Sequence, residues 1–455
     1  MEKGLLPTSI PADGDGHGAH PSLAPAGRRA WIILALSVLV LVALLLRLQT
    51  AWQRNYESPH ELALRLVGDE TNYEGLAYAL LQGEFFQWPG RVPVYPLFIA
   101  ATYYALGERS PAKLLYVQAL VGGAVVPLTY LLARRLTGII PALGAAGIVA
   151  LDDSLIEHAG QIYTELLYTP LLLVALLALL WAVQAPRLGR FAWAGASMAV
   201  VTLCRPTTVL IPLILPLVLP QGWKLKRKVG AFLMYCLAMA VVITPWTYHN
   251  WREYHRFLLL SVSTAVLWQG SPEFYHLTQR NRNHLDIWAN ELNPERNGGH
   301  DPFTIDGDQY FTRRALQSIR AEPGVYVAYS LKKAGYFWLG NPAAEWGYFA
   351  LYDWQTMRQW YPYSSLKLLS MFMTRQLPLI ALVALVFLAV RNRVRSLVPL
   401  VMVCVYFTLI HMITWSEMRF SGPLHPLLAI ILMAAGKEGC DCLTRSPMLE
   451  LGSED

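Results

Sequence analysis

Charged residues are scarce in this 455-residue chain. Only 15% of the residues are Asp, Glu, Lys or Arg, whereas 55% are hydrophobic. A soluble globule of this length needs more polar residues than that to cover its surface. The composition therefore argues against a soluble protein and predicts an integral membrane protein whose apolar residues face lipid.

Cysteine is also rare, with five residues in the whole chain. Cys204, Cys236 and Cys404 lie inside apolar runs, and Cys440 and Cys442 lie near the C-terminus. This distribution excludes an extracytoplasmic disulfide framework. The net charge of +6 comes from short clusters of Lys and Arg instead of one continuous basic stripe. We therefore expect no nucleic-acid partner.

Long apolar runs recur along the chain and predict about ten spanning helices. They occupy residues 30–49, 114–133, 138–151, 162–183, 191–204, 207–221, 229–246, 376–391, 396–413 and 420–436. Because Lys and Arg clusters favour the cytoplasmic side, about ten spans place every such cluster inside. If a further apolar run at 93–107 crossed the membrane alone, every later Lys and Arg cluster would lie on the outer side. We predict a re-entrant or surface-lying helix there, with about twelve spans as the alternative.

The predicted spans divide the chain into regions on the two sides of the membrane, and we expect the functional residues on the outer side. We expect a disordered cytoplasmic tail at 1–27, a transmembrane module at 28–246 with an outer loop at 50–92, an extracytoplasmic cap at 247–375, C-terminal spans at 376–436 and a cytoplasmic tail at 437–455. The cap segment is too long for a structureless loop, so it is expected to be mainly helical. Chemistry is expected in the outer segments, including the turn at 414–419.

The clearest chemical motif is Gly68-Asp69-Glu70, which follows the first predicted span. Adjacent carboxylates before a helical pattern often serve only as a helix cap. Here they precede Arg91 and the stiff turn Pro93-Val94-Tyr95-Pro96, which leads into an apolar segment. This context favours a functional site.

The chain resembles the GT-C superfamily of glycosyltransferases, in the branch that contains protein O-mannosyltransferases and lipid A aminoarabinose transferases. The residues that carry the resemblance are Gly68-Asp69-Glu70, Arg91 with Pro93, Tyr95 and Pro96, Thr164-Glu165-Leu166, Arg205-Pro206-Thr207, Pro245-Trp246 and Glu417-Met418-Arg419-Phe420. One departure is Arg-Val-Pro-Val-Tyr-Pro where the family usually has Arg-Pro-Pro-Leu-Tyr-Pro. The resemblance implies an all-α integral membrane protein, a GT-C-like bundle with a small extracytoplasmic cap, and a polyprenyl-phosphate-linked sugar as donor.

The resemblance also implies roles for particular residues. Asp69 is expected to be the general base, and Glu70 either orients the acceptor, positions Asp69 or caps the helix. A departing lipid phosphate needs positive charge, and the candidates are Arg91, Arg205, His249, Arg252 and Arg419. Further substrate-binding candidates are Tyr95, Asp152, Asp153, Glu165 and Glu417. The carrier needs a groove, and two interpretations of the nearby aromatic residues stay open: they line that groove, or they form an aromatic belt at the membrane surface, which is favoured for each residue taken singly. These residues are Tyr95, Tyr103, Tyr104, Trp246 and Trp268.

No cofactor and no metal ligand is assigned, although the outer carboxylates are of the type that binds a divalent metal. The expected partners are the lipid-linked donor, an extracytoplasmic acceptor that is a protein, lipid or glycan, and the bilayer of the plasma membrane. A transporter or flippase is the alternative, for which ionisable groups near the bilayer centre and two related halves are expected. A non-catalytic assembly or sensor subunit is a third interpretation.

Overall fold

All regular elements in the described part of the chain are helices. The computed structural model describes residues 25–56, 66, 68–263, 265–280, 284–340 and 365–445, and no strand occurs among them. Most of the predicted tail at 1–27 and the end of the predicted tail at 437–455 lie outside these residues. The all-α membrane fold that the apolar runs and the family resemblance predict is confirmed.

Among the residues that the structure describes, seven helical segments are long and apolar enough to cross a membrane, or eight if one bent pair counts as a span. They are Arg29–Asn55, Pro111–Arg134, Glu165–Gln184, Leu225–Tyr254, Met373–Val390, Arg395–Ile413 and Met418–Cys442, and the bent pair is Ile139–Ala150 with Asp153–Gly160. Two other predicted spans are shorter apolar helices, Leu188–Cys204 and Pro206–Val218. The sequence prediction of about ten therefore exceeds the number of full-length spans, because hydropathy alone does not separate a long helix from a short or broken one.

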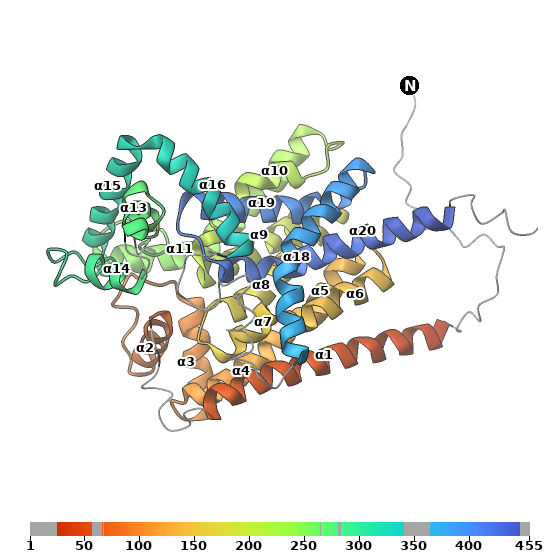
Figure 1. Cartoon of the computed structure of the whole chain (residues 1–455), viewed down its shortest axis with the longest axis horizontal. Helices are drawn as coiled ribbons and strands as arrows, with labels where there is room; N and C mark the ends of the chain where they lie inside the picture. The colour runs from red at the N-terminus through yellow and green to blue at the C-terminus, as the bar shows by residue number, and fades with distance from the viewer. Residues whose placement is uncertain are drawn as a thin grey trace, which may run out of the picture.

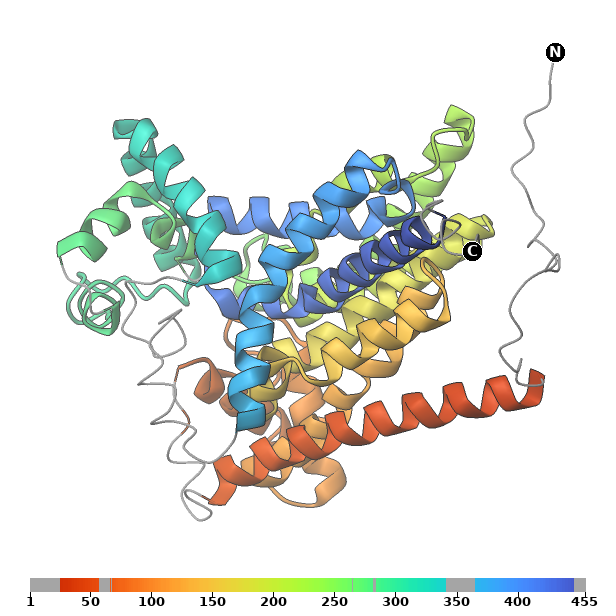
Figure 2. The same cartoon turned by 45° about the vertical axis from the view of Figure 1, so that its right-hand side comes forward.

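The bundle has two distinct ends (Figures 1 and 2). The helices α13 (Pro272–Arg280), α14 (His284–Glu291), α15 (Ile305–Ala321) and α16 (Pro323–Leu339) gather at one end together with α2 (Asp69–Leu81). The N-terminal end of α1 (Pro25–Tyr56) and the C-terminal end of α20 (His425–Arg445) lie toward the other end. The predicted cap and the Gly68-Asp69-Glu70 motif therefore share one end of the molecule.

The centre of the bundle consists of closely packed helices. The helix α9 (Leu188–Cys204) packs against α8 (Glu165–Gln184) and α11 (Leu225–Tyr254). A Cβ added at Gly195 would lie 2.1 Å from the carbonyl oxygen of Tyr235, so only glycine permits this approach. On the other side, α20 packs on α6 (Ile139–Ala150) and α18 (Ser365–Val390), and α5 (Val125–Arg134) packs on α6 and α8.

The segment between α2 and α4 determines where the acidic motif lies. Gly68 has φ 58°, a left-handed conformation that favours glycine, and it places Asp69 and Glu70 in the first turn of α2. The helix α3 (Val94–Leu106) packs against α2 and has 13 residues, too few for a span. The helix α4 (Pro111–Gly123) begins where the Ser110 side chain accepts a hydrogen bond from the backbone N–H of Lys113.

The cap has a hydrophobic core of its own. Its members come from the short helix α12 (Val266–Gln269), from α13, α14 and α15, and from the turn after α19 (Val398–Ile413); they are Ala265, Trp268, Phe274, Ile287, Phe311, Ala315 and Trp415. The other short elements are the helices α7 (Asp153–Glu157) and α10 (Leu215–Val218) and the 3-10 helices η2 (His158–Gly160), η3 (Pro206–Thr208), η4 (Ile211–Ile214), η5 (Arg395–Leu397) and η6 (Met418–Leu424). The described part of the predicted cap is mainly helical, as expected, although α11 continues to Tyr254 and α18 already begins at Ser365.

Candidate active site

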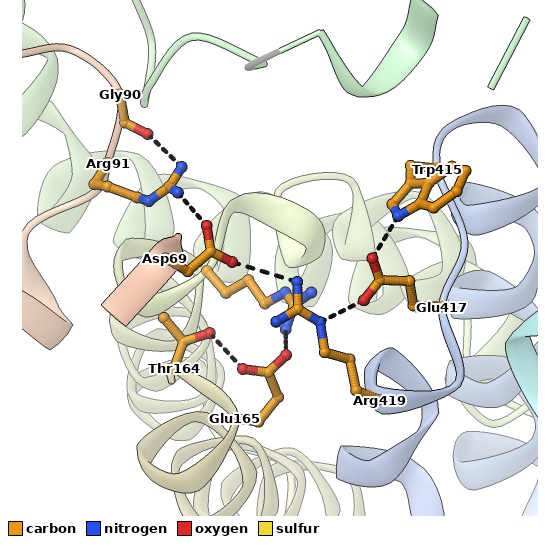
Figure 3. Close-up of polar contacts among 9 residues, drawn as sticks. Asp69, Gly90, Arg91, Thr164, Glu165, Trp415, Glu417 and Arg419 are labelled. Atoms are coloured by element: carbon orange, nitrogen blue, oxygen red, sulfur yellow. Dashed lines mark hydrogen bonds and ion pairs between the residues drawn. The ribbon is translucent and has the colours of Figure 1, made fainter. Parts of the chain in front are cut away.

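Asp69 lies between two arginines that come from distant parts of the chain (Figure 3). Arg91 donates from Nη2 to Asp69 Oδ1 at 2.5 Å, and Arg419 donates from Nη2 to Asp69 Oδ2 at 3.3 Å. The Asp69 side chain is nevertheless 35% exposed. Each carboxylate oxygen has a second lone pair, so Asp69 keeps accepting capacity on the side open to solvent.

Arg91 is held in place by its own loop and by aromatic rings. Its Nη1 donates to the carbonyl of Gly90 at 3.1 Å. Its guanidinium lies 5.1 Å from the ring centre of Tyr73, 5.8 Å from that of Trp88 and 5.6 Å from that of Phe303. Phe303 belongs to the cap, which therefore reaches the first arginine of the site directly.

Arg419 occupies the turn that leads into α20, within η6. Its Nε lies 2.6 Å from Glu417 Oε2, an ion pair in which the N–H direction does not meet hydrogen-bond geometry. The other oxygen of Glu417, Oε1, accepts a hydrogen bond from the indole N–H of Trp415 at 2.7 Å. Glu417 and Asp69 thus contact Arg419 from two sides (Figure 3).

A third arginine lies close to the second. Arg205, which follows α9, donates from Nη1 to Glu165 Oε1 at 2.6 Å, and Glu165 Oε2 accepts from the Thr164 hydroxyl at 3.1 Å. The Arg205 and Arg419 guanidiniums lie 4.4 Å and 5.0 Å from the ring centre of Phe420. Two cationic groups therefore pack on one aromatic ring beside Asp69.

Two tyrosines near the site stay protonated around neutral pH. Burial raises the pKa of Tyr73 and the pKa of Tyr163 to about 12. Tyr163 also lies under Arg419, whose guanidinium is 4.8 Å from its ring centre. Neither phenol is ionised to act as a base at neutral pH, whereas Asp69 offers exposed carboxylate oxygens.

Glu70 points away from Asp69 although the two are adjacent in sequence. Its Oε2 accepts a hydrogen bond from Arg54 Nη2 at 3.2 Å, and its Oε1 accepts the backbone N–H of Ile162 at 3.0 Å. The side chain is buried. Of the three roles predicted for Glu70, these contacts favour the positioning of α2, and therefore of Asp69, on α1 and on the segment before α8.

The remaining predicted site residues differ in burial and in contacts. Tyr95 is completely buried and donates to Gln118 Oε1 at 2.5 Å. Asp152 caps α7 and lies 2.8 Å from His425 Nδ1, and the backbone N–H of Asp153 donates to the Thr374 hydroxyl. His249 packs among aromatic rings, and Arg252 is exposed on the last turn of α11.

Most of the aromatic residues considered for the lipid groove lie in the protein interior. Tyr95, Tyr103, Trp246 and Trp268 are buried, because each fills the interior and its polar group finds a partner there, and only Tyr104 is exposed. These four buried rings do not line an open groove in this structure. As for a metal, no group of three or more His, Cys, Asp or Glu side chains suited to an ion occurs among the residues that the structure describes.

Comparison with known proteins agrees with this architecture. Residues 90–249, roughly a third of the chain, match the family model described as dolichyl-phosphate-mannose-protein mannosyltransferase. The oligosaccharyltransferase AglB of Archaeoglobus fulgidus, solved with an inhibitory peptide and a dolichol-phosphate, superposes with a TM-score of 0.54 at 15% identity. That superposition covers 94% of this chain and 53% of AglB. The chain has the GT-C fold.

The predicted resemblance to the GT-C superfamily is thereby confirmed. The apo form of the same archaeal enzyme gives a TM-score of 0.55. ArnT from Cupriavidus metallidurans bound to undecaprenyl phosphate aligns over 95% of this chain and 82% of ArnT at 14% identity, but its TM-score of 0.38 is too low to bear on the fold. No curated protein matches the chain in sequence. The chain spans about half the length of AglB.

Sequence reasoning missed part of the candidate site. Trp415 and Tyr163 both contact the network around Arg419, yet neither was singled out from the sequence. Each lies within two positions of a residue in a recognised motif, Glu417 or Glu165. That proximity was the available signal, but aromatic residues at a membrane surface are too common for it to decide.

Proposed function

We propose that the protein transfers a sugar from a polyprenyl-phosphate carrier to an extracytoplasmic acceptor, with Asp69 as the general base. The main support is that Arg91 and Arg419 both donate hydrogen bonds to Asp69, at the end of the bundle that also bears the cap. In addition, Arg419 and Arg205 both pack on the ring of Phe420. The match to a dolichyl-phosphate-mannose-dependent family supports a lipid-phosphate donor. The dolichol-phosphate bound to AglB supports the same donor class.

The chemistry follows from these positions. Asp69 takes the proton of the acceptor hydroxyl or amide, the acceptor atom forms a bond to the anomeric carbon, and the bond from that carbon to the phosphate oxygen breaks. The electron pair of the broken bond leaves with the polyprenyl phosphate. Arg419 and Arg205 neutralise the charge that develops on it. A single displacement of this kind inverts the anomeric centre.

We further propose that the cap end faces away from the cytoplasm in the plasma membrane. The cap and α2 share that end, whereas the start of α11 lies away from the cap (Figures 1 and 2). Lys224 directly precedes α11, and Lys226, Arg227 and Lys228 lie in its first turn. Lys and Arg clusters favour the cytoplasmic side. The sugar and acceptor are therefore proposed to meet on the extracytoplasmic face, beneath the cap.

Buried ionisable groups favour a second candidate, the transporter or flippase. Arg47 in α1 is completely buried, and Asp152 and His425 form a buried pair. Such groups inside a bundle are typical of transport pathways. The structure gives no contact between these side chains and the exposed carboxylate of Asp69. The transferase is therefore the better supported function.

The experiment is a donor panel. Purified protein is incubated with several polyprenyl-phosphate sugars and membrane-extracted acceptors, and the release of free polyprenyl phosphate is measured. We expect release with at least one donor and none from the Asp69→Asn variant. Translocation of a fluorescent lipid across proteoliposomes without release from any donor would instead support the flippase.

A further inference from the structure

One member of the hydrophobic core of the cap does not belong to the cap segment. Trp415 lies in the turn after α19, two residues before Glu417, and it enters the core formed by α12 to α15. Its ring centre is 5.3 Å from that of Phe274 and 6.3 Å from that of Trp288, both at steep interplanar angles. The position of this indole is therefore set by the packing of the cap.

The same indole is bonded to the site. Its N–H donates to Glu417 Oε1 at 2.7 Å, Glu417 Oε2 is 2.6 Å from Arg419 Nε, and Arg419 Nη2 is 3.3 Å from Asp69 Oδ2. Figure 3 shows these contacts as one continuous chain from the ring to the carboxylate. A rigid ring at one end thus determines the orientation of the carboxylate that contacts Arg419.

This bond selects between the two faces of Glu417. Because Oε1 is occupied by the indole N–H, Oε2 is turned toward Arg419. Without that N–H, the carboxylate has no such restraint, and rotation about its last torsion is broad. Groups that orient a ligand-contacting side chain in this way contribute strongly to affinity although they do not touch the ligand.

The cap has other attachments to the same turn. The Tyr326 hydroxyl donates to the carbonyl of Ile413 at 3.1 Å, and the Ser416 hydroxyl donates to the carbonyl of Lys333 at 3.0 Å. Lys333 Nζ also donates to Gly270 within the cap and lies 3.4 Å from the carbonyl oxygen of Ile413. Loss of the indole N–H alone therefore leaves the cap docked.

We propose that Trp415 is a positioning residue through which the cap orients Arg419 toward the phosphate of the lipid carrier. The inference rests on the proposed function, since it assigns Arg419 to the carrier phosphate. It also gives the cap a role besides contact with the acceptor. A cap whose packing changes would alter the affinity of the site for the lipid phosphate through this one indole.

The chain provides a closely matched control. Trp268 lies in the same core, and its indole N–H donates to Glu273 at 3.0 Å; Glu273 in turn pairs with Arg314. The Trp268→Phe and Trp415→Phe variants both keep an aromatic ring in the core and both lose one Trp–Glu hydrogen bond. Only the second loss lies next to the site.

The test compares the KM for the polyprenyl-phosphate sugar, the kcat and the thermal midpoint of the two variants. We expect Trp415→Phe to raise the donor KM about tenfold with a smaller change in kcat, and Trp268→Phe to leave the donor KM unchanged at a similar thermal midpoint. An unchanged KM in Trp415→Phe, or an equal rise in both variants, would overturn the inference.

A second variant covers the case in which Trp415→Phe does not fold. Glu417→Gln keeps an oxygen for the indole but removes the charge that faces Arg419, and the same rise in donor KM is expected; a normal KM would also overturn the inference. Failure of the proposed function is recognised separately, because the wild-type protein would then neither bind polyprenyl phosphate nor release it from any donor.

Discussion

The adjacent carboxylates Asp69 and Glu70 are expected to differ when each is replaced by its amide. The change at Glu70 should lower stability, whereas the change at Asp69 should lower the rate of transfer. The Glu70 side chain is 3% exposed, and it holds both Arg54 and the backbone N–H of Ile162. Gln at this position keeps one oxygen for the Ile162 N–H and loses the ion pair. Breaking a fully buried pair costs about 3–5 kcal/mol. Because Arg54 is 35% exposed, a smaller loss of about 1–2 kcal/mol is expected.

A graded series sharpens this expectation. Glu70→Ala also leaves the Ile162 N–H without its acceptor, which adds about 1–3 kcal/mol. Asp69→Asn removes the proposed base, and a fall in kcat of about 10²- to 10⁴-fold is expected with little change in stability. The assay records the thermal midpoint by tryptophan fluorescence in detergent, together with the rate of sugar transfer per folded molecule.

The outcome that refutes this reasoning is specific. Glu70→Gln with a wild-type midpoint and an activity as low as that of Asp69→Asn would mean that Glu70 acts in the chemistry. An Asp69→Asn variant with full activity would remove Asp69 from the role of base. Either result would show that the roles inferred for Asp69 and Glu70 from their contacts are wrong.

Further predictions concern the other buried charges. Arg205→Gln leaves Glu165 buried without its ion-pair partner, so this variant is expected to raise the donor KM and to lower the thermal midpoint. The double variant Arg205→Gln/Glu165→Gln is expected to lower the midpoint less, because no unpaired charge is left buried. Equal midpoints for the single and double variants would exclude this coupling. Burial lowers the pKa of Lys333 to about 7, from 10.5 in the unfolded chain. The unfolded state therefore binds more protons between these values, and stability rises from pH 7 to about pH 10.5 and is lowest below pH 7. Lys333→Met should lose this rise; a midpoint difference from wild type that stays constant with pH would contradict it.

The sequence predicted the features that depend on composition and on residue type. Nine of the ten apolar runs are mainly α-helical, because a bilayer requires helices whose backbone groups pair internally, whereas the run at 207–221 consists of 3-10 helices, turns and the short α10. Asp69 was identified from the Gly68-Asp69-Glu70 motif and the family resemblance. Arg205 and Arg419 also belong to the motifs of that resemblance, and each lies at the end of an apolar run, where a charge avoids burial in lipid. The structure links all three through direct contacts or through the shared Phe420 ring.

The rest depended on contacts between distant segments. The pairing of Asp152 with His425 joins residues 273 positions apart, and no local pattern announces it. Asp69 and Glu70 have the same chemistry in sequence, and only the orientation of α2 separates an exposed carboxylate from a buried one. Trp415 was indistinguishable from the other aromatic residues near the membrane until its ring was seen inside the cap core.

Transfer from a radiolabelled donor tests the central claim most directly. The protein is reconstituted in proteoliposomes with a polyprenyl-phosphate sugar labelled in the sugar, and the label is followed from the lipid to the acceptor for wild type and for Asp69→Asn. The account predicts that wild-type protein moves the label onto the acceptor with inverted anomeric configuration, whereas the Asp69→Asn variant leaves it on the lipid. Transfer at equal rates by both proteins, or a retained configuration, would contradict it.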